Sequence, residues 1–133
     1  GAELILIPSP QMPLIMDIVK KRTPTWLPGV PTLYQKIMDA AEEKDVDLSG
    51  IRNAFSGAAT LPVEIVERWE TMTGGRLVEG FGMTETSPVL TANPMNGKHR
   101  PGYVGVPFPD TEVRIANPEN LDETQPDGQP GQP

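Results

Sequence analysis

The densest group of chemically useful residues lies at positions 80–86, where two glycines flank an aromatic ring and a hydroxyl and a carboxylate follow. Glycine lets a backbone approach a ligand closely because it has no Cβ. Phe81 offers a flat face, Thr84 a hydroxyl group, and Glu85 a hard oxygen ligand of the kind that suits Mg²⁺. These residue types in this order are typical of a nucleotide site at the end of a strand.

A structural role explains the same stretch equally well. Thr84 can cap a following helix, and Glu85 then lies in the first turn, where the helix dipole favours a carboxylate. The two interpretations are compatible, because a helix N-terminus is also an anion site. The residues alone leave both open.

Other candidate positions give weaker indications. Residues 56–60 are small and follow a strand candidate, a pattern that close packing explains more often than a ligand does. Turn chemistry accounts fully for residues 28–31. His99, the only histidine, lies in a basic loop with no acidic partner nearby in sequence, so we expect it at the surface. With one histidine and no cysteine, neither a Ser-His-Asp triad nor a thiolate metal site can be assembled.

Length and charge narrow the class of protein. The 133 residues are enough for about one domain, and the net charge of −7 gives no general attraction to nucleic acid or anionic membrane. No apolar run approaches the roughly 20 residues of a membrane span. No basic leader precedes the apolar run at residues 4–7, so we expect no signal peptide. Because the chain begins directly on this predicted core strand, we expect it to be a piece of a longer protein. The absence of cysteine fits a reducing, cytoplasmic compartment.

Short apolar runs alternate with amphipathic stretches in the first part of the chain. We expect strands at residues 4–7, 25–27, 51–55 and 76–78, and helices at 12–22, 31–41 and 62–73. This β-α-β-α-β-α-β order predicts the α/β class, with a mainly parallel sheet and flanking helices. Ligands bind outside the carboxyl ends of such strands, where residues 56–60 and 80–85 fall.

The pattern changes after Glu85. Residues 87–101 are polar and interrupted by prolines, whereas residues 104–106 and 112–115 alternate as two antiparallel strands would. The tail from Asn117 is too polar to pack, so we expect it to be flexible. We therefore predict an α/β unit at 1–107 and the start of a β-rich subdomain at 108–133.

Five motifs occur in one order, at residues 28–34, 47–49, 56–62, 80–86 and 102–107. In this the chain resembles the AMP-forming acyl-CoA synthetases of the adenylate-forming superfamily, and most closely the bacterial long-chain fatty-acid–CoA ligases. The resemblance implies that a fatty acid reacts with ATP to give acyl-AMP and pyrophosphate, after which the acyl group passes to CoA. Two alternatives within the superfamily are an aryl or short-chain acid–CoA ligase and a fatty-acyl-AMP ligase. Outside it, a non-catalytic α/β nucleotide-binding or interaction module stays open.

The resemblance also implies roles for single residues. Thr84 contacts the α-phosphate and Glu85 holds Mg²⁺, which makes these two the catalytic residues. Phe81 packs against adenine, and Val30, Gly57 and Met83 border the acyl channel. The implied nucleotide-binding set is Gly57, Ala58, Ala59, Glu79, Gly80, Phe81, Gly82, Met83 and Thr84.

The sequence departs from the superfamily pattern at several points. Phe81 stands where tyrosine is more common, and Thr60 where proline is frequent. The upstream phosphate loop, the ribose-binding aspartate and the C-terminal lysine of the superfamily have no counterpart in the 133 residues. The resemblance therefore implies one wall of an ATP site, inactive by itself. A longer parent is expected in the cytoplasm or peripheral to a membrane, and an unpaired sheet edge suggests a homodimer.

Overall fold

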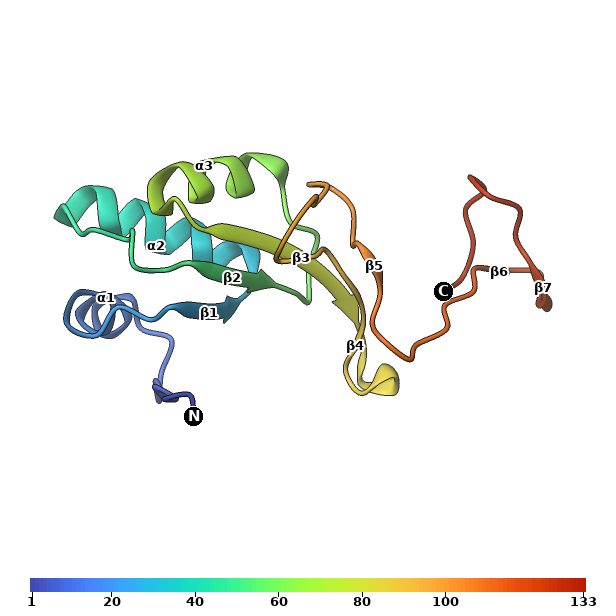
Figure 1. Cartoon of the computed structure of the whole chain (residues 1–133), viewed down its shortest axis with the longest axis horizontal. Helices are drawn as coiled ribbons and strands as arrows, with labels where there is room; N and C mark the ends of the chain where they lie inside the picture. Colours follow the sequence, from blue (N-terminus) through green and yellow to red (C-terminus); the bar gives the residue numbers. More distant parts are fainter.

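The computed structural model describes all 133 residues. It contains three α-helices, a five-stranded sheet and a separate two-stranded ribbon (Figure 1). Helices α2 and α3 lie along one face of the sheet, and α1 packs against α2. In chain order the helices are α1 (Met12–Lys21), α2 (Pro31–Lys44) and α3 (Val63–Thr73). The strands of the main sheet are β1 (Trp26–Gly29), β2 (Asn53–Ser56), β3 (Arg76–Gly82), β4 (Val89–Ala92) and β5 (Val106–Pro107).

Local sequence signals explain where the helices begin and end. Proline lies in the first turn of α1 and of α2, where its missing N–H costs nothing. Lys20 and Lys21 occupy the last turn of α1, where cations oppose the helix dipole. Gly74, with φ of 65°, ends α3 in the left-handed conformation. The three predicted helices are thus confirmed within a few residues at each end.

One apolar core joins the three helices to the sheet. It contains 15 buried residues, and its centre is the pair Tyr34 of α2 and Trp69 of α3, whose rings meet edge-to-face at 4.9 Å. Ala54 and Leu77 supply the sheet side of this core. Burial of these side chains, rather than helix propensity, holds the layers together.

The sheet has the order β1-β2-β3-β4-β5 and changes character along β3. Arg76–Glu79 pair in parallel with β2, whereas Gly80–Gly82 pair in antiparallel with β4. The α/β class is confirmed: β1, β2 and β3 are parallel and carry the helices. Because β3 continues past the last residue of β2, a notch opens between the two strands.

The strand predicted at residues 4–7 is wrong. Leu4 and Leu6 are 80% and 78% exposed, and β1 is an end strand of the sheet. An apolar run becomes a strand only where a neighbouring strand accepts its hydrogen bonds, and none is beside this one. The segment at 87–101, expected to be a polar loop, instead contains β4, because Val89–Ala92 pair with the exposed edge of β3.

The C-terminal strands also differ from expectation. Residues 112–115 are irregular, and 104–106 contribute only Val106 to β5, which pairs with β4. In the tail from Asn117, β6 (Ala116–Asn117) and β7 (Asn120–Thr124) form the two-stranded ribbon, and the flexibility of this tail stays a prediction. The Asn117 side chain accepts the Glu119 N–H at 2.9 Å, an Asx turn that reverses the chain. None of the helices is long and apolar enough to span a bilayer.

Candidate functional site

A groove of about 530 Å³ lies where β1 and β2 end and β3 continues. Its lining combines the end of β1, the loop after β2 and the last residues of β3. Eight residues nominated from the sequence line it, namely Val30, Gly57, Ala58, Gly80, Phe81, Gly82, Met83 and Thr84. Positions far apart in the sequence thus form one concave surface at the carboxyl ends of the parallel strands, where α/β sheets bind ligands.

The glycines of this groove serve two different purposes. A Cβ on Gly80 would overlap the Phe55 ring, and one on Gly82 would overlap the Pro88 carbonyl. Close packing of β3 therefore requires both glycines, independently of any ligand. Gly57 is different, since its nearest neighbours would be 3.9 and 4.0 Å from a Cβ. Of these three groove residues, only Gly57 has room for a Cβ.

The loop that follows β2 has an unusual backbone. Ala58 adopts a left-handed φ of 66°, which costs a residue with a Cβ about 1–2 kcal/mol. Gly57 N–H donates to the Gly29 carbonyl at 3.2 Å and so fixes the start of the loop to the end of β1. Ala59, also nominated for the nucleotide, is exposed and lies outside the groove lining.

The turn after β3 is closed by Thr86. Its hydroxyl accepts the Met83 N–H at 3.0 Å and lies 2.9 Å from the Pro88 carbonyl oxygen. A single 3₁₀ turn, η1 (Thr84–Thr86), results. Thr84 is its first residue and not its cap, and the side chain that accepts the Met83 N–H is that of Thr86. Thr84 and Glu85 are exposed, and neither side chain makes a hydrogen bond within the chain.

Glu79 lies apart from the groove. It is 7% exposed, and its Oε1 accepts the backbone N–H of Leu61 at 3.0 Å, just before α3. Glu85 is likewise absent from the lining, although it follows Thr84 directly. The structure therefore brings together the nominated residues except Ala59, Glu79 and Glu85.

Whether Glu85 suits Mg²⁺ depends on its donor set. No cluster of three or more acidic or histidine side chains exists in the chain, so a protein cage for a metal is absent. Mg²⁺ is usually held by one or two carboxylates together with substrate phosphates. The single exposed carboxylate of Glu85, beside the groove, is compatible with that arrangement.

Tyr34 supports the groove from below. Its hydroxyl donates to the carbonyl oxygen of Phe55 at 2.8 Å and lies 3.0 Å from that of Leu27, so the two carbonyl groups share one proton. Burial raises the pKa of the Tyr34 phenol far above its ordinary range, and the hydrogen bond to Phe55 opposes that rise only in part. The neutral side chain of one helix thus contacts the backbones of β1 and β2.

Sequence reasoning missed part of the lining. Pro28, Gly29, Phe55, Pro88 and Val89 also face the groove. The rule that nominated the ends of β2 and β3 applies equally to β1 and would have found Gly29. Phe55 depends on which face of β2 it occupies, and Val89 on a strand whose existence the sequence did not reveal. A larger apolar groove of about 680 Å³ adjoins, sharing Phe55 and Val89 and bordered also by Trp26 and Phe108.

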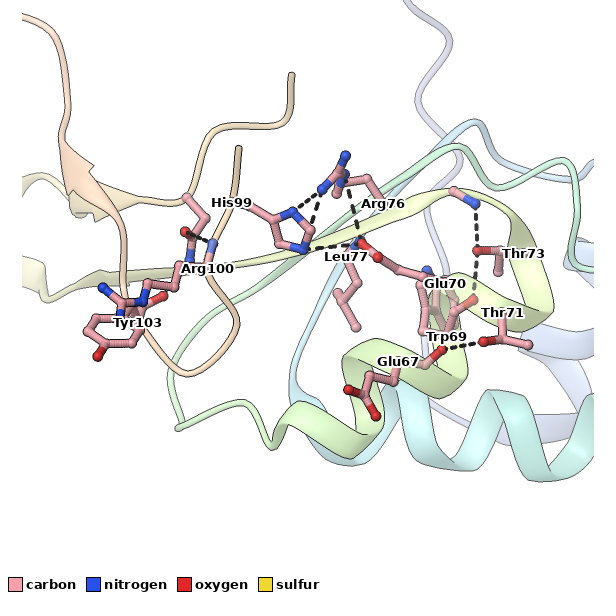
Figure 2. Close-up of polar contacts among 12 residues, drawn as sticks. Glu67, Trp69, Glu70, Thr71, Thr73, Arg76, Leu77, His99, Arg100 and Tyr103 are labelled. Carbon is pink, nitrogen blue, oxygen red and sulfur yellow. Dashed lines mark hydrogen bonds and ion pairs between the residues drawn. The ribbon is translucent and has the colours of Figure 1, made fainter. Parts of the chain in front are cut away.

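His99 is not the surface residue expected from its sequence neighbours. Its side chain is 13% exposed, and Nε2 lies 3.6 Å from Oε1 of Glu70 (Figure 2). The Arg76 guanidinium contacts the same ring, and Leu77 N–H donates to Glu70 at 3.2 Å. The acidic partner comes from α3, 29 residues away in sequence. The loop around His99 is thereby held against α3 and β3.

Three parallel strands covered by helices, with a groove of small loop residues and a glycine-flanked aromatic at the strand ends, have the layout of α/β proteins that bind ligands there. The family model described as AMP-binding enzyme matches residues 1–132, and the chain belongs to this family. It is 43% identical over 119 residues to a long-chain-fatty-acid–CoA ligase of Bacillus subtilis and 34% identical over 123 residues to one of Yersinia pestis. These matches include 90% and 92% of the chain but 21% and 22% of the relatives.

Solved structures agree on the fold. An anthranilate–CoA ligase in complex with anthranoyl-AMP superposes with a TM-score of 0.87 at 27% identity, over 98% of this chain and 25% of that one. A benzoate–CoA ligase from Burkholderia xenovorans gives 0.76 at 29% identity, over 90% and 24%. The chain therefore spans about a fifth to a quarter of the length of the proteins that it matches.

Proposed function

We propose that the chain forms one wall of the ATP site of an AMP-forming fatty-acid–CoA ligase. The observation that carries this proposal is the groove itself, which joins Gly57 and Ala58 from one strand end to the residues 80–84 from the next. A shared surface of this kind is what a planar base followed by phosphates requires, and the family membership supports it.

Within this proposal each part of the groove has a role. Adenine lies between the Gly57–Ala58 backbone and the Phe81 ring, whose flat face it can stack on. The free hydroxyl of Thr84 donates to the α-phosphate. Glu85 holds Mg²⁺, which when bound neutralises charge on phosphate oxygens. Ala59 and Glu79, which lie outside the lining, act through the loop rather than by contact.

The chemistry follows from these positions. A carboxylate attacks the α-phosphorus of ATP to give acyl-AMP and pyrophosphate, and the CoA thiol then displaces AMP. Catalysis in such transfers comes mainly from positioning and charge neutralisation. Thr84 and Glu85 suit those tasks as exposed groups beside the groove. ATP, the acid and CoA are thus the proposed small-molecule partners.

The acid substrate is the finer part of the proposal. The names of the bacterial relatives favour a long-chain fatty acid. The two solved structures, in contrast, are of enzymes named as anthranilate–CoA and benzoate–CoA ligases. The apolar groove beside the nucleotide groove favours a long alkyl chain. Val30, Gly57 and Met83 are proposed to face the acyl group near its carboxylate. An aryl or short-chain acid is the second candidate.

Two experiments test the proposal at separate levels. In amide correlation spectra of the chain, AMP should shift the signals of Gly57, Gly80 and Gly82 but leave Gly128 unchanged, and CMP should shift them less. Absence of any AMP-induced shift would contradict the nucleotide site.

For the reaction, the chain replaces the matching segment of the Bacillus subtilis ligase. That chimera should release pyrophosphate with long-chain acids and form their CoA esters, and activity with benzoate alone would contradict the long-chain assignment.

Four further expectations belong to this proposal. The chain alone should not catalyse adenylation, because it holds a single wall of the site. The chain divides into an α/β unit at 1–107 and the start of a β-rich subdomain at 108–133. Limited proteolysis should therefore cleave first between these two units. The ligase as a whole is cytoplasmic or peripheral to a membrane. A homodimer forms through the free edge of β1; a strictly monomeric mass in light scattering at high concentration would count against it.

A further inference from the structure

Glu79 combines a buried position with an acidic side chain. Only 7% of the residue is exposed, yet it occupies the middle of β3 between residues of the core and residues of the groove. A buried carboxylate is costly unless it is hydrogen-bonded. Its partner is the backbone N–H of Leu61, which Oε1 accepts at 3.0 Å. A side chain of β3 therefore holds the segment that leads into α3.

That segment is the loop which carries Gly57 and Ala58 into the groove. At its start, Gly57 N–H donates to the Gly29 carbonyl at 3.2 Å. At its end, the hydrogen bond from Leu61 to Glu79 closes it. Residues 58–60 make no backbone hydrogen bond between these two points, and all three are exposed. The loop is thus fixed at two places, one of which is Glu79.

The loop also needs to be held. Ala58 stands in the left-handed region with φ of 66°, a conformation that a free chain with a Cβ avoids. Strained backbone persists where the surroundings determine it. Glu79 is well placed for this task, since Ser56, the last residue of β2, is its register partner, and the Glu79 carbonyl accepts the Asn93 N–H at 2.9 Å.

We propose that Glu79 is a positioning residue for the nucleotide site. Its carboxylate holds residues 57–61 in the shape that presents Gly57 and Ala58 to Phe81, and it makes no contact with the nucleotide itself. The absence of Glu79 from the groove lining supports this assignment. The inference rests on the proposed function for the identity of the ligand but not for the geometry of the loop.

The test compares Glu79→Leu, Glu79→Asp and Glu79→Gln with the wild-type chain. In Glu79→Leu no acceptor remains for the Leu61 N–H, and in Glu79→Asp the carboxylate is too short to reach it. In Glu79→Gln the side-chain oxygen can still accept. We expect amide exchange at Leu61 to accelerate about tenfold in the first two variants and to stay near wild type in Glu79→Gln. Unchanged Leu61 exchange in Glu79→Leu would overturn the proposal without reference to any nucleotide.

Nucleotide affinity then separates positioning from contact. AMP affinity should fall about tenfold in Glu79→Leu and recover in Glu79→Gln. IMP lacks the exocyclic amino group of adenine, and its affinity should fall by the same factor in Glu79→Leu. The ratio of AMP affinity to IMP affinity should therefore be the same in Glu79→Leu as in the wild type. A change in that ratio would mean direct contact and would overturn the proposal. If wild-type AMP binding is absent, the proposed function fails, whereas Leu61 exchange still decides the role of Glu79.

Two control variants exclude a general loss of stability. Ile15→Val trims the core in α1, far from the loop, and should lower the melting temperature without changing AMP affinity. Glu67→Leu removes an exposed carboxylate from α3 and should leave both Leu61 exchange and AMP affinity unchanged. An equal loss of AMP affinity in Ile15→Val would assign the Glu79 effect to stability and contradict positioning.

Discussion

The Tyr34 hydroxyl donates to the Phe55 carbonyl at 2.8 Å, which joins a buried side chain of α2 to the backbone of a residue that lines the groove. The same hydroxyl lies 3.0 Å from the Leu27 carbonyl of β1. One side chain thus contacts the backbones of two neighbouring strands, β1 and β2, after which loop residues enter the groove. Core packing and site geometry meet at this residue.

Tyr34→Phe should therefore reduce stability although the ring and its contact with Trp69 remain. Two partly buried carbonyl groups lose their shared donor, which should cost about 1–2 kcal/mol in the free energy of unfolding, measured with urea. Tyr103→Phe is the matched control, because Tyr103 is 53% exposed, and should change stability by less than about 0.5 kcal/mol. Equal urea midpoints for Tyr34→Phe and Tyr103→Phe would contradict this role of Tyr34.

Gly80→Ala should disturb the fold itself. The new Cβ would overlap the Phe55 ring and lie 3.0 Å from the Thr91 carbonyl oxygen, so β3 must shift away from β4. We expect a loss of about 1–3 kcal/mol, as for other overpacked sites, measured by urea unfolding. A Gly80→Ala chain with unchanged stability and spectra would contradict the packing requirement at this position.

Gly57→Ala should separate ligand binding from folding. No atom lies closer than 3.9 Å to the added Cβ, so stability should change by less than about 0.5 kcal/mol. The methyl group enters the groove, however, and should weaken AMP binding in a titration followed by the Gly82 amide signal. Wild-type affinity in a folded Gly57→Ala chain would remove this position from the adenine wall.

Glu85→Gln addresses the proposed metal ligand. In the chimeric ligase, the Mg²⁺ concentration for half-maximal pyrophosphate release should rise about tenfold, because a neutral amide is a poorer ligand than a carboxylate. Glu67→Gln, a change of the same kind on the exposed face of α3, should leave the Mg²⁺ dependence unaltered. An identical dependence in Glu85→Gln would exclude this residue from the metal site.

The carboxyl group of Asp39 makes the stability of the fold depend on pH. The hydrogen bond from Arg68, reinforced by one from Gln35, holds the pKa of the Asp39 carboxyl below its ordinary value of 3.8. A lowered folded-state pKa adds stability above the unfolded value, and that stability is lost as pH falls through the folded value. Asp39→Asn should thus melt below wild type at about pH 7, with the difference vanishing in strong acid. High salt should shrink the difference at neutral pH, and a difference that grows on acidification would contradict the assignment.

Much of the fold is determined by local sequence signals. Proline near each helix start, lysines at the end of α1 and glycine after α3 act within a few residues, so the three helices were predictable. The alternation of strands and helices likewise predicted a parallel sheet with its ligand residues at the strand ends. Gly57 and residues 80–84 were found in this way because strand ends are visible in sequence.

Other features depend on partners that only the tertiary structure brings near. The run at residues 4–7 is apolar enough for a strand but has no neighbour to pair with, whereas Val89–Ala92 becomes a strand because β3 offers it an edge. His99 lies beside its acidic partner in α3, and Glu79 accepts the Leu61 N–H from across the loop. The sequence by itself determined which residues could carry chemistry. Pairing and burial decided which of them face the groove, since both depend on contacts between distant segments.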